Sequence, residues 1–240
     1  MAELVDALDS GSSGSDIVEV RVLSSALVKS RAFGSGSFTF WLGHDATQPP
    51  AGPVPVGPIP EVPMTERREL YSGRIVKLGL ETATLPNGQT VSLEIIRHPG
   101  AAAIVPLHAD GSVSLIRQHR HAAGGMIWEV PAGVVDPGES PSRCAHRELA
   151  EEVQLAADQM SPLGAIFTTP GFTDERIHLF LATGLRPIDS APEADEYIEV
   201  HRLPLPVALQ MIADGEITDA KTICALHAAA ARASVTRRSG

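Results

Sequence analysis

Short strand-like runs of apolar residues recur from Ile75 onward, with turn-forming residues between them. Their length and their bounding glycine, proline and aspartate residues are typical of β-strands. The pair Asn87-Gly88 stands between two of these runs and predicts a hairpin. The runs predicted to form strands are Ile75–Leu80, Thr90–Arg97, Ala102–Leu107, Val113–His119, Leu163–Thr168, Arg176–Ala182 and Tyr197–Arg202.

Three other segments are predicted to be helices. In the first of them, Ala145, Leu149 and Val153 follow one another at intervals of four and form an apolar stripe that can pack on a sheet. Gly215 separates the last two helices, and Thr218 is the predicted N-cap of the final one. The predicted helices are Pro141–Val153, Pro206–Ala213 and Asp219–Ala231.

The chain divides into two regions that differ in composition and in sequence pattern. In residues 64–240, strands surround a central helix and terminal helices follow, which predicts a single mixed α/β domain. Residues 1–63 have no periodic pattern long enough for a domain. Glycine and serine dominate residues 10–15 and 34–37, and seven of the fifteen residues in 49–63 are proline. This composition is typical of a disordered tail.

A second hypothesis for residues 1–63 concerns their coding sequence. Residues 2–7 and 20–22 can be encoded by sequences that resemble the D-arm and T-arm of a leucine-type transfer-RNA gene. On this interpretation, translation starts at Met64 and the first 63 residues are a mis-annotated start. Both hypotheses predict that this region has no fold of its own.

Charge and cysteine content exclude several classes of protein. The formal net charge is −10, whereas a nucleic-acid-binding protein needs a basic face. No apolar run is long enough to span a membrane, and the acidic N-terminus does not resemble a secretory signal. The two cysteines cannot form a disulfide framework. We therefore expect a cytoplasmic protein that binds neither nucleic acid nor membranes.

Three glutamates share one face of the predicted central helix. Glu148, Glu151 and Glu152 stand at positions i, i+3 and i+4. Such a cluster is often only a solvated acidic surface. Here it ends a longer pattern in which Gly133 is followed after five residues by Glu139, and then after seven residues by an arginine and Glu148. This fixed spacing favours a functional site.

The pattern resembles the signature of the Nudix hydrolase family. The matching residues are Gly133, Glu139, Arg147, Glu148, Leu149, Glu151, Glu152 and Leu155. Gln154 departs from the signature, which has a glycine there to end the helix in a left-handed turn. Gln154 would either adopt that conformation at a cost of about 1–2 kcal/mol or end the helix in another way. The resemblance implies an α/β protein with the Nudix fold, an α/β/α sandwich with a mixed β-sheet.

The resemblance also implies a metal-dependent reaction. Nudix hydrolases cleave diphosphates with Mg²⁺ or Mn²⁺, and carboxylate oxygens suit these hard cations. Glu148 and Glu152 would be the main metal ligands, with Glu151 supporting both the metal and catalysis, and the Ala132 carbonyl adding a ligand. The remaining signature residues, Gly133, Glu139 and Arg147, would be structural, with an Arg147–Glu139 pair holding the loop against the helix.

Further segments resemble the ADP-ribose pyrophosphatase subfamily. Pro170 lies sixteen residues after Gln154 in a loop, Thr169–Glu175, like the one that marks this subfamily. By the same resemblance, Arg120 would contact the substrate diphosphate, and Glu129, Pro170 and Glu175 would line the substrate site. The neighbouring histidines 119 and 121 are expected to be bystanders. Residues 215–222 resemble the entry of the C-terminal helix in this subfamily.

The resemblance leaves two candidates for the general base. An acidic loop precedes the strand that begins near Tyr197, and Glu196 matches the position of the base best, with Glu193 as the second choice. Members of the subfamily are homodimers that exchange N-terminal strands, so residues 64–100 are expected at an interface.

Together these features predict hydrolysis of the diphosphate bond of ADP-ribose or a related nucleoside-diphosphate sugar, giving AMP and ribose 5-phosphate. One alternative is a Nudix hydrolase of another nucleotide, such as a diadenosine polyphosphate, coenzyme A or capped RNA. Another alternative is a catalytically silent Nudix domain that senses a ligand. A purely structural acidic helix in an unrelated fold is the third.

Overall fold

The computed structural model describes residues 66–189 and 197–238. The predicted tail of residues 1–63 and the alternative start at Met64 lie outside the described residues. The strands are β1 (Glu66–Ser72), β2 (Lys77–Thr84), β3 (Thr90–Arg97), β4 (Ala101–Pro106), β5 (Ser112–Arg120), β6 (Gly125–Glu129), β7 (Ala132–Val134), β8 (Leu155–Phe167), β9 (Arg176–Pro187) and β10 (Ile198–Pro204). The helices are α1 (Pro141–Val153), α2 (Leu205–Ala213) and α3 (Ala220–Arg238), with a short 3₁₀ turn, η1 (His121–Ala123).

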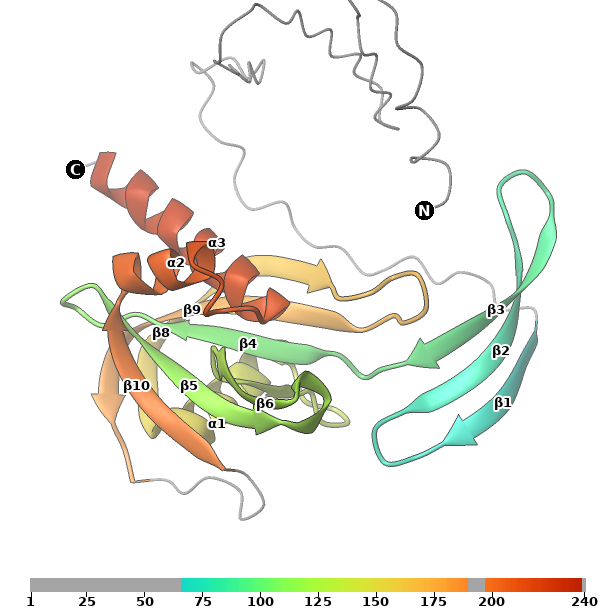
Figure 1. Cartoon of the computed structure of the whole chain (residues 1–240), viewed down its shortest axis with the longest axis horizontal. Helices are drawn as coiled ribbons and strands as arrows, with labels where there is room; N and C mark the ends of the chain where they lie inside the picture. The colour runs from blue at the N-terminus through green and yellow to red at the C-terminus, as the bar shows by residue number, and fades with distance from the viewer. Residues whose placement is uncertain (1–65, 190–196, 239–240) are drawn as a thin grey trace, which may run out of the picture. The chain divides into compact units, whose positions relative to one another are not determined.

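The described strands form three sheets (Figure 1). The largest has the order β7-β4-β9-β8 and is mixed, because β4 and β9 run parallel while the other pairs are antiparallel. A second, antiparallel sheet has the order β10-β5-β6. The N-terminal strands form a third, antiparallel sheet with the order β1-β2-β3.

Helices cover both faces of the central strands, as alternate residues of β4 show. Ala103 and Val105 belong to an apolar core that includes residues of α2 and α3. Ala102 and Ile104, on the opposite face of the same strand, pack in a second core with the apolar stripe of α1. Figure 1 shows α1 and the α2–α3 pair on opposite sides of the strands. The predicted α/β/α sandwich with a mixed sheet is therefore confirmed.

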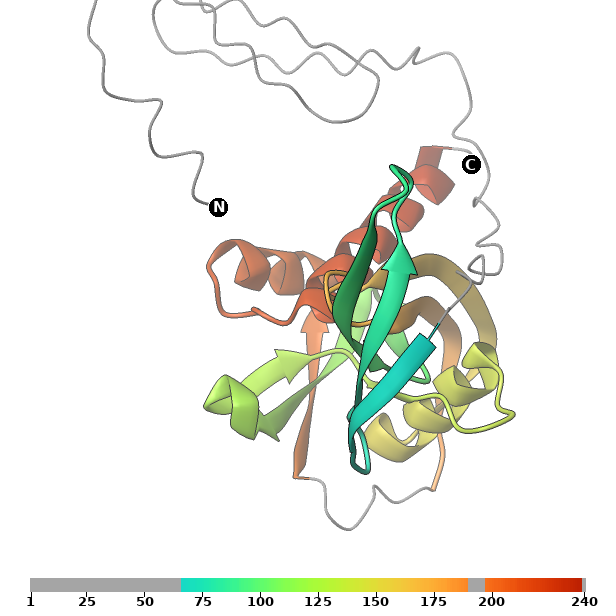
Figure 2. The ribbon, with the colours of Figure 1, turned by 90° about the vertical axis from the view of Figure 1, so that its right-hand side faces the viewer.

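The N-terminal sheet is joined to the rest of the domain at the end of β3. The Ile96 N–H donates to the Phe172 carbonyl at 2.8 Å, and Arg97 forms an ion pair with Asp174 at 2.9 Å. Arg97 also pairs with the buried carboxylate of Glu81, and this hydrogen bond lowers the pKa of Glu81. In Figure 2 the β1–β2–β3 sheet, in teal and green, stands in front of the other strands.

The sequence pattern predicted the bounds of some helices and strands correctly and those of others incorrectly. The predicted bounds of α1 and of β3 agree with the structure, and the predicted Asn87-Gly88 hairpin joins β2 to β3. The final helix begins at Ala220 and extends to Arg238, beyond the predicted end at Ala231. Its N-cap is Asp219 rather than Thr218, because the Asp219 carboxylate accepts a hydrogen bond from the Thr222 N–H at 2.9 Å. Among the described helices, none is long and apolar enough to cross a membrane.

Gln154 takes the first of the two expected helix endings. It is the C-cap of α1, with φ 55° and ψ 40°, in the left-handed region. Its N–H donates to the Ala150 carbonyl, so the turn has the hydrogen bonding of a glycine-terminated helix without the glycine. Gln154 is the one non-glycine residue with positive φ in the described part of the chain.

We expect Gln154→Gly to stabilise the protein. Glycine removes the left-handed penalty of about 1–2 kcal/mol but adds entropy to the unfolded chain, so the net gain is about 0.5–1 kcal/mol. Thermal or urea unfolding measures this change. Gln159→Gly is the matched control, because Gln159 is exposed in the extended strand β8, where glycine lowers the stability of a strand. A loss of stability in Gln154→Gly would contradict the account of this helix end.

Candidate active site

The acidic face of α1 is held in place by local capping and by packing. The Ser140 side chain accepts a hydrogen bond from the Arg143 N–H, and Pro141 occupies the first helical position. The adjoining apolar stripe of Ala145, Leu149 and Val153 is buried in the core shared with β4 and β9. The same core includes Cys144, and burial raises the pKa of the Cys144 thiol to about 12, so the thiol stays protonated at neutral pH. The helix thus presents its glutamates toward the loop at β7.

Two of the three glutamates are buried against the backbone of β7. Glu148 is 8% exposed and Glu152 is 5% exposed. The Glu152 carboxylate accepts a hydrogen bond from the Ala132 N–H at 2.8 Å. A Cβ atom on Gly133 would stand 1.8 Å from Oε1 of Glu148, so only glycine permits this close approach of carboxylate and backbone. Steric crowding by Glu148 therefore explains why the signature has glycine at position 133.

Arg147 connects the loop to the helix. Its guanidinium binds Glu139 through two hydrogen bonds of 3.1 and 3.2 Å and donates to the Val134 carbonyl at 3.0 Å. These bonds raise the pKa of Arg147 and lower that of Glu139. The expected Arg147–Glu139 pair is thus present, and it fixes the loop between β7 and α1.

The same guanidinium also contacts the helix glutamates. Nη1 of Arg147 lies 2.6 Å from Glu148 and 3.0 Å from Glu151. No three histidine, cysteine, aspartate or glutamate side chains converge as a ready-made metal site within residues 66–189 and 197–238. The donors nevertheless fit a hard divalent cation, because carboxylates that are largely withdrawn from water lie beside a backbone turn that only glycine allows. A cation bound there would compete with Arg147 for Glu148.

The opposite side of the site is a buried ion-pair network. Glu129, at the end of β6, is 2% exposed and receives two hydrogen bonds from Arg120, of 2.8 and 3.1 Å. Lys221, in the first turn of α3, lies 3.1 Å from Glu129 and 3.1 Å from Asp219. The network brings the ends of β5 and β6 together with the start of α3, and it leaves Arg120 partly exposed.

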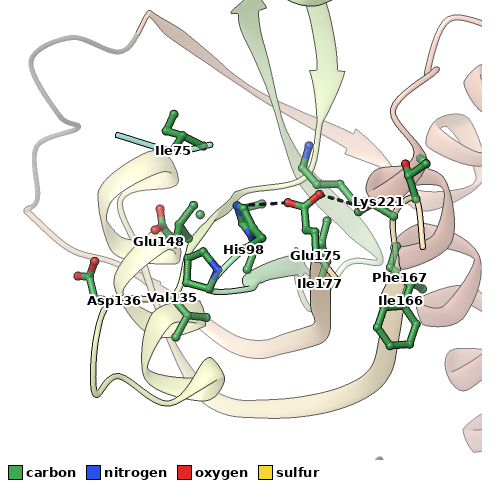
Figure 3. A pocket seen from close by; sticks show the side chains of 18 of the residues that line it. Ile75, His98, Val135, Asp136, Glu148, Ile166, Phe167, Glu175, Ile177 and Lys221 are labelled. Carbon is green, nitrogen blue, oxygen red and sulfur yellow. Dashed lines mark hydrogen bonds and ion pairs between the residues drawn. The ribbon is translucent and has the colours of Figure 1, made fainter. Parts of the chain in front are cut away.

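The helix glutamates with Arg147 form one wall of a pocket of about 1320 Å³, and the network of Arg120 and Lys221 forms the other wall (Figure 3). Glu148 and Glu151 line it, as do Ala132 and Gly133. Its basic lining residues are Arg74, Lys77, Arg97, Arg120, Arg147 and Lys221. A cavity lined by carboxylates together with guanidinium and ammonium groups suits a polyanion that is bound together with a cation.

The loop around Pro170 meets the pocket only in part. Pro170 is exposed in a turn and does not line the pocket, whereas Thr168 and Glu175 do. Glu175 lies 3.6 Å from His98, and its other carboxylate oxygen accepts a hydrogen bond from Thr168 at 2.8 Å. The structure therefore brings Glu175, but not Pro170, to the pocket lining.

Among the predicted residues that the structure describes, Glu129, Glu139 and Glu152 do not line the pocket themselves, and several lining residues were not predicted. Glu193 and Glu196 lie outside the described residues. The histidines at 119 and 121 are exposed and do not line the pocket. His98 and Lys221 do line it, although neither belongs to a spaced motif. The only sequence signal for Lys221 was its place in the segment 215–222.

Comparisons with known proteins agree with this arrangement. The NUDIX domain family matches residues 97–233. A methanol dehydrogenase activator of Bacillus methanolicus is 40% identical over 161 residues, which cover 66% of this chain and 87% of that protein. An ADP-ribose pyrophosphatase of Bacillus subtilis is 36% identical over 163 residues, covering 67% of this chain and 88% of that protein.

A solved structure shows the same fold. The crystal structure of an ADP compounds hydrolase superposes with a TM-score of 0.64 at 22% identity, covering 72% of this chain and 94% of that one. The family match spans more than half of the 240 residues and includes both walls of the pocket. The chain therefore belongs to the Nudix family and is a Nudix pyrophosphohydrolase.

Proposed function

We propose that this enzyme hydrolyses the diphosphate bond of ADP-ribose or a related nucleoside-diphosphate sugar, producing AMP and ribose 5-phosphate from ADP-ribose. The observation that carries the proposal is the pocket, which Glu148 and Glu151 of the Nudix helix line together with the basic side chains of Arg97, Arg120 and Lys221. The similarity to the Bacillus subtilis ADP-ribose pyrophosphatase supports this choice of substrate.

Glu148 and Glu152 are the proposed residues for holding Mg²⁺ or Mn²⁺, with the Ala132 carbonyl and Glu151 in support. When bound, such an ion neutralises phosphate oxygens and lowers the pKa of water. Arg147 contacts Glu148 and Glu151 and is itself held by Glu139 and the Val134 carbonyl. Because a cation competes with Arg147 for Glu148, binding of Mg²⁺ is expected to loosen that contact but leave the Arg147–Glu139 pair intact.

The other wall orients the substrate. Glu129 fixes the Arg120 guanidinium through two hydrogen bonds, and Arg120 lines the pocket, where a guanidinium group is suited to bind a phosphate. For the general base that takes a proton from the attacking water, the sequence places Glu196 ahead of Glu193. Comparison of Glu196→Gln with Glu193→Gln decides between them: the base variant loses kcat, and the other variant keeps it.

We expect Arg120→Ala to weaken substrate handling more than metal binding. Loss of a guanidinium–phosphate contact is expected to lower kcat/KM about tenfold or more, mainly through KM. Lys221 continues to neutralise the buried Glu129, so the fold is expected to persist. Steady-state kinetics and a Mg²⁺ titration measure the two effects. Arg202→Ala is the matched control, because Arg202 pairs with Asp110 and does not line the pocket. An unchanged kcat/KM in Arg120→Ala would remove this residue from the site.

A nucleotide panel tests the substrate. The values of kcat/KM are compared for ADP-ribose, GDP-mannose, a diadenosine polyphosphate and coenzyme A, each with Mg²⁺. The proposal predicts the highest value for ADP-ribose or the other sugar nucleotide. A clear preference for coenzyme A or the dinucleotide would contradict the assignment of Arg120 and Glu175 to a sugar-nucleotide site.

We also propose a homodimer formed through the β1–β2–β3 sheet. This sheet exposes Leu70, Tyr71, Ile75 and Leu93, counting the loop between β1 and β2, and a second copy could cover these apolar side chains. Light scattering of the full chain is expected to give twice the mass of one chain, and Tyr71→Glu is expected to shift the protein toward the monomer. A monomer in the wild type would contradict the proposal.

A second candidate function follows from the 40% identity to a methanol dehydrogenase activator. On this proposal, the enzyme raises the activity of a dehydrogenase when the two proteins are mixed. The test is the rate of methanol oxidation by a methanol dehydrogenase with and without this chain, and then with Glu152→Gln. No increase with the wild type would exclude the candidate.

A further inference from the structure

His98 follows the end of β3 and lines the pocket. A hydrogen bond from the backbone determines which ring nitrogen of the neutral imidazole carries the proton. The side chain of His98 is only 10% exposed. The Gly100 N–H donates a hydrogen bond to Nδ1 of His98 at 3.1 Å. A ring nitrogen that accepts a hydrogen bond carries no proton, so the neutral imidazole must hold its proton on Nε2.

The Nε2 atom faces Glu175. Nε2 lies 3.6 Å from Oε1 of Glu175. A dashed line in Figure 3 joins the two side chains. This distance is longer than a hydrogen bond, and a shift of about 0.5 Å would bring it into the usual range. Such contacts are often long before substrate binds and shorten afterwards. The other oxygen of Glu175 accepts a hydrogen bond from the Thr168 hydroxyl at 2.8 Å. The carboxylate therefore has a donor on each side.

The backbone around this pair is tied together. The carboxylate of Asp174 accepts hydrogen bonds from the His98 N–H and from the Arg97 side chain, at 2.8 and 2.9 Å. The Ile96 N–H is bonded to the Phe172 carbonyl at 2.8 Å. The end of β3 and the loop that carries Glu175 are thus linked by several hydrogen bonds. The position of the Glu175 carboxylate then depends on its side-chain contacts with His98 and Thr168.

We propose that His98 is a positioning residue, which holds the Glu175 carboxylate in the pocket through an Nε2–H donor so that it can accept a hydrogen bond from the bound nucleotide sugar. The inference rests on the proposed function and deepens it. Glu175 bound in this way contributes to substrate affinity rather than to the reacting atoms. Loss of His98 should therefore appear in KM and leave kcat nearly unchanged.

Two substitutions separate the two nitrogens of the ring. In His98→Gln, the amide nitrogen can replace the Nε2–H donor. In His98→Asn, the shorter amide can replace Nδ1 as the acceptor from Gly100 but cannot reach Glu175. We expect His98→Gln to stay within about threefold of the wild-type kcat/KM, and His98→Asn to raise KM about tenfold, the effect of losing one hydrogen bond to a charged group. Thermal unfolding is expected to be alike in the two variants.

A double-mutant cycle with Glu175→Gln tests whether His98 acts through Glu175. We expect His98→Asn to have little further effect on KM in the Glu175→Gln background. Equal effects of His98→Asn in both backgrounds, or indistinguishable Gln and Asn variants, would overturn the proposal. The cycle uses the substrate with the highest kcat/KM in the nucleotide panel. If that substrate is not a nucleotide sugar, the proposed function fails while the coupling of His98 to Glu175 is still measured.

The tautomer gives a readout that does not depend on activity. Nitrogen-15 spectra of the full chain, with His98 assigned from the signals missing in His98→Asn, distinguish Nε2–H from Nδ1–H imidazole. We expect the Nε2–H form, with a change in its Nε2 signal in Glu175→Gln. An Nδ1–H tautomer would overturn the proposal.

Discussion

Gly133→Ala is expected to lower kcat by about 100-fold while the protein stays folded. The new methyl carbon would stand 1.8 Å from Oε1 and 2.1 Å from Cδ of Glu148, far inside contact distance. The obstructing atoms are the end of a flexible side chain, so the carboxylate moves and the backbone does not have to. A displacement of about 1 Å in a group that must be held accurately can cost about 100-fold in rate. The change in the free energy of unfolding should stay near 1 kcal/mol.

Gly125→Ala is the matched control for this substitution. A Cβ atom on Gly125 meets nothing within 4 Å, and the residue does not have positive φ. Steady-state kinetics with saturating Mg²⁺ and a thermal unfolding curve on each variant provide the comparison. If Gly133→Ala kept the wild-type kcat, the position of the Glu148 carboxylate would not matter to the reaction, and its assignment as a metal ligand would be wrong.

Glu152→Gln is the second substitution with a large expected effect. We expect kcat to fall by about 100-fold or more, because the amide keeps the shape of the side chain but removes a negative charge proposed to bind the metal. The amide oxygen can still accept the hydrogen bond from the Ala132 N–H, which Glu152 now accepts at 2.8 Å. The fold and the start of β7 should therefore be preserved.

The Mg²⁺ dependence of this variant separates weak metal binding from lost chemistry. A variant that regains activity at high Mg²⁺ has lost affinity, whereas a low kcat at saturation indicates misplaced charge. Glu216→Gln is the matched control, because Glu216 is exposed in the loop between α2 and α3. Full activity of Glu152→Gln at ordinary Mg²⁺ concentrations would remove Glu152 from the site.

The elements that the sequence predicted best are those specified by local interactions. Helix α1 begins and ends where expected because Ser140 caps it, Pro141 starts it and an apolar stripe of period four runs along it. Strand β1 was missed because most of its residues are exposed, so it lacks the alternation of a half-buried strand. Pairing with β2 and the ion pair of Arg67 with Glu81 hold it instead.

The residues of the candidate site likewise divide into those predicted by spacing within one element and those that meet only after folding. Spacing along a single helix placed Glu148 and Glu152 on one face, because helical geometry fixes that relation. Lys221 and His98 could not be predicted, because their partners Glu129 and Glu175 belong to other elements and meet them only after folding. The contact of Arg147 with Glu148 and Glu151 was missed for another reason. The sequence suggested a role for Arg147 on the loop side alone, whereas its guanidinium reaches both sides.

The most direct test of the proposed reaction is to identify the products when the 240-residue chain is incubated with ADP-ribose and Mg²⁺. We expect AMP and ribose 5-phosphate in equal amounts from the wild type, and almost none of either product from Glu152→Gln measured beside it. Intact ADP-ribose after incubation with folded wild-type protein would contradict the proposed reaction. Equal product from both proteins would contradict the role given to the Nudix helix.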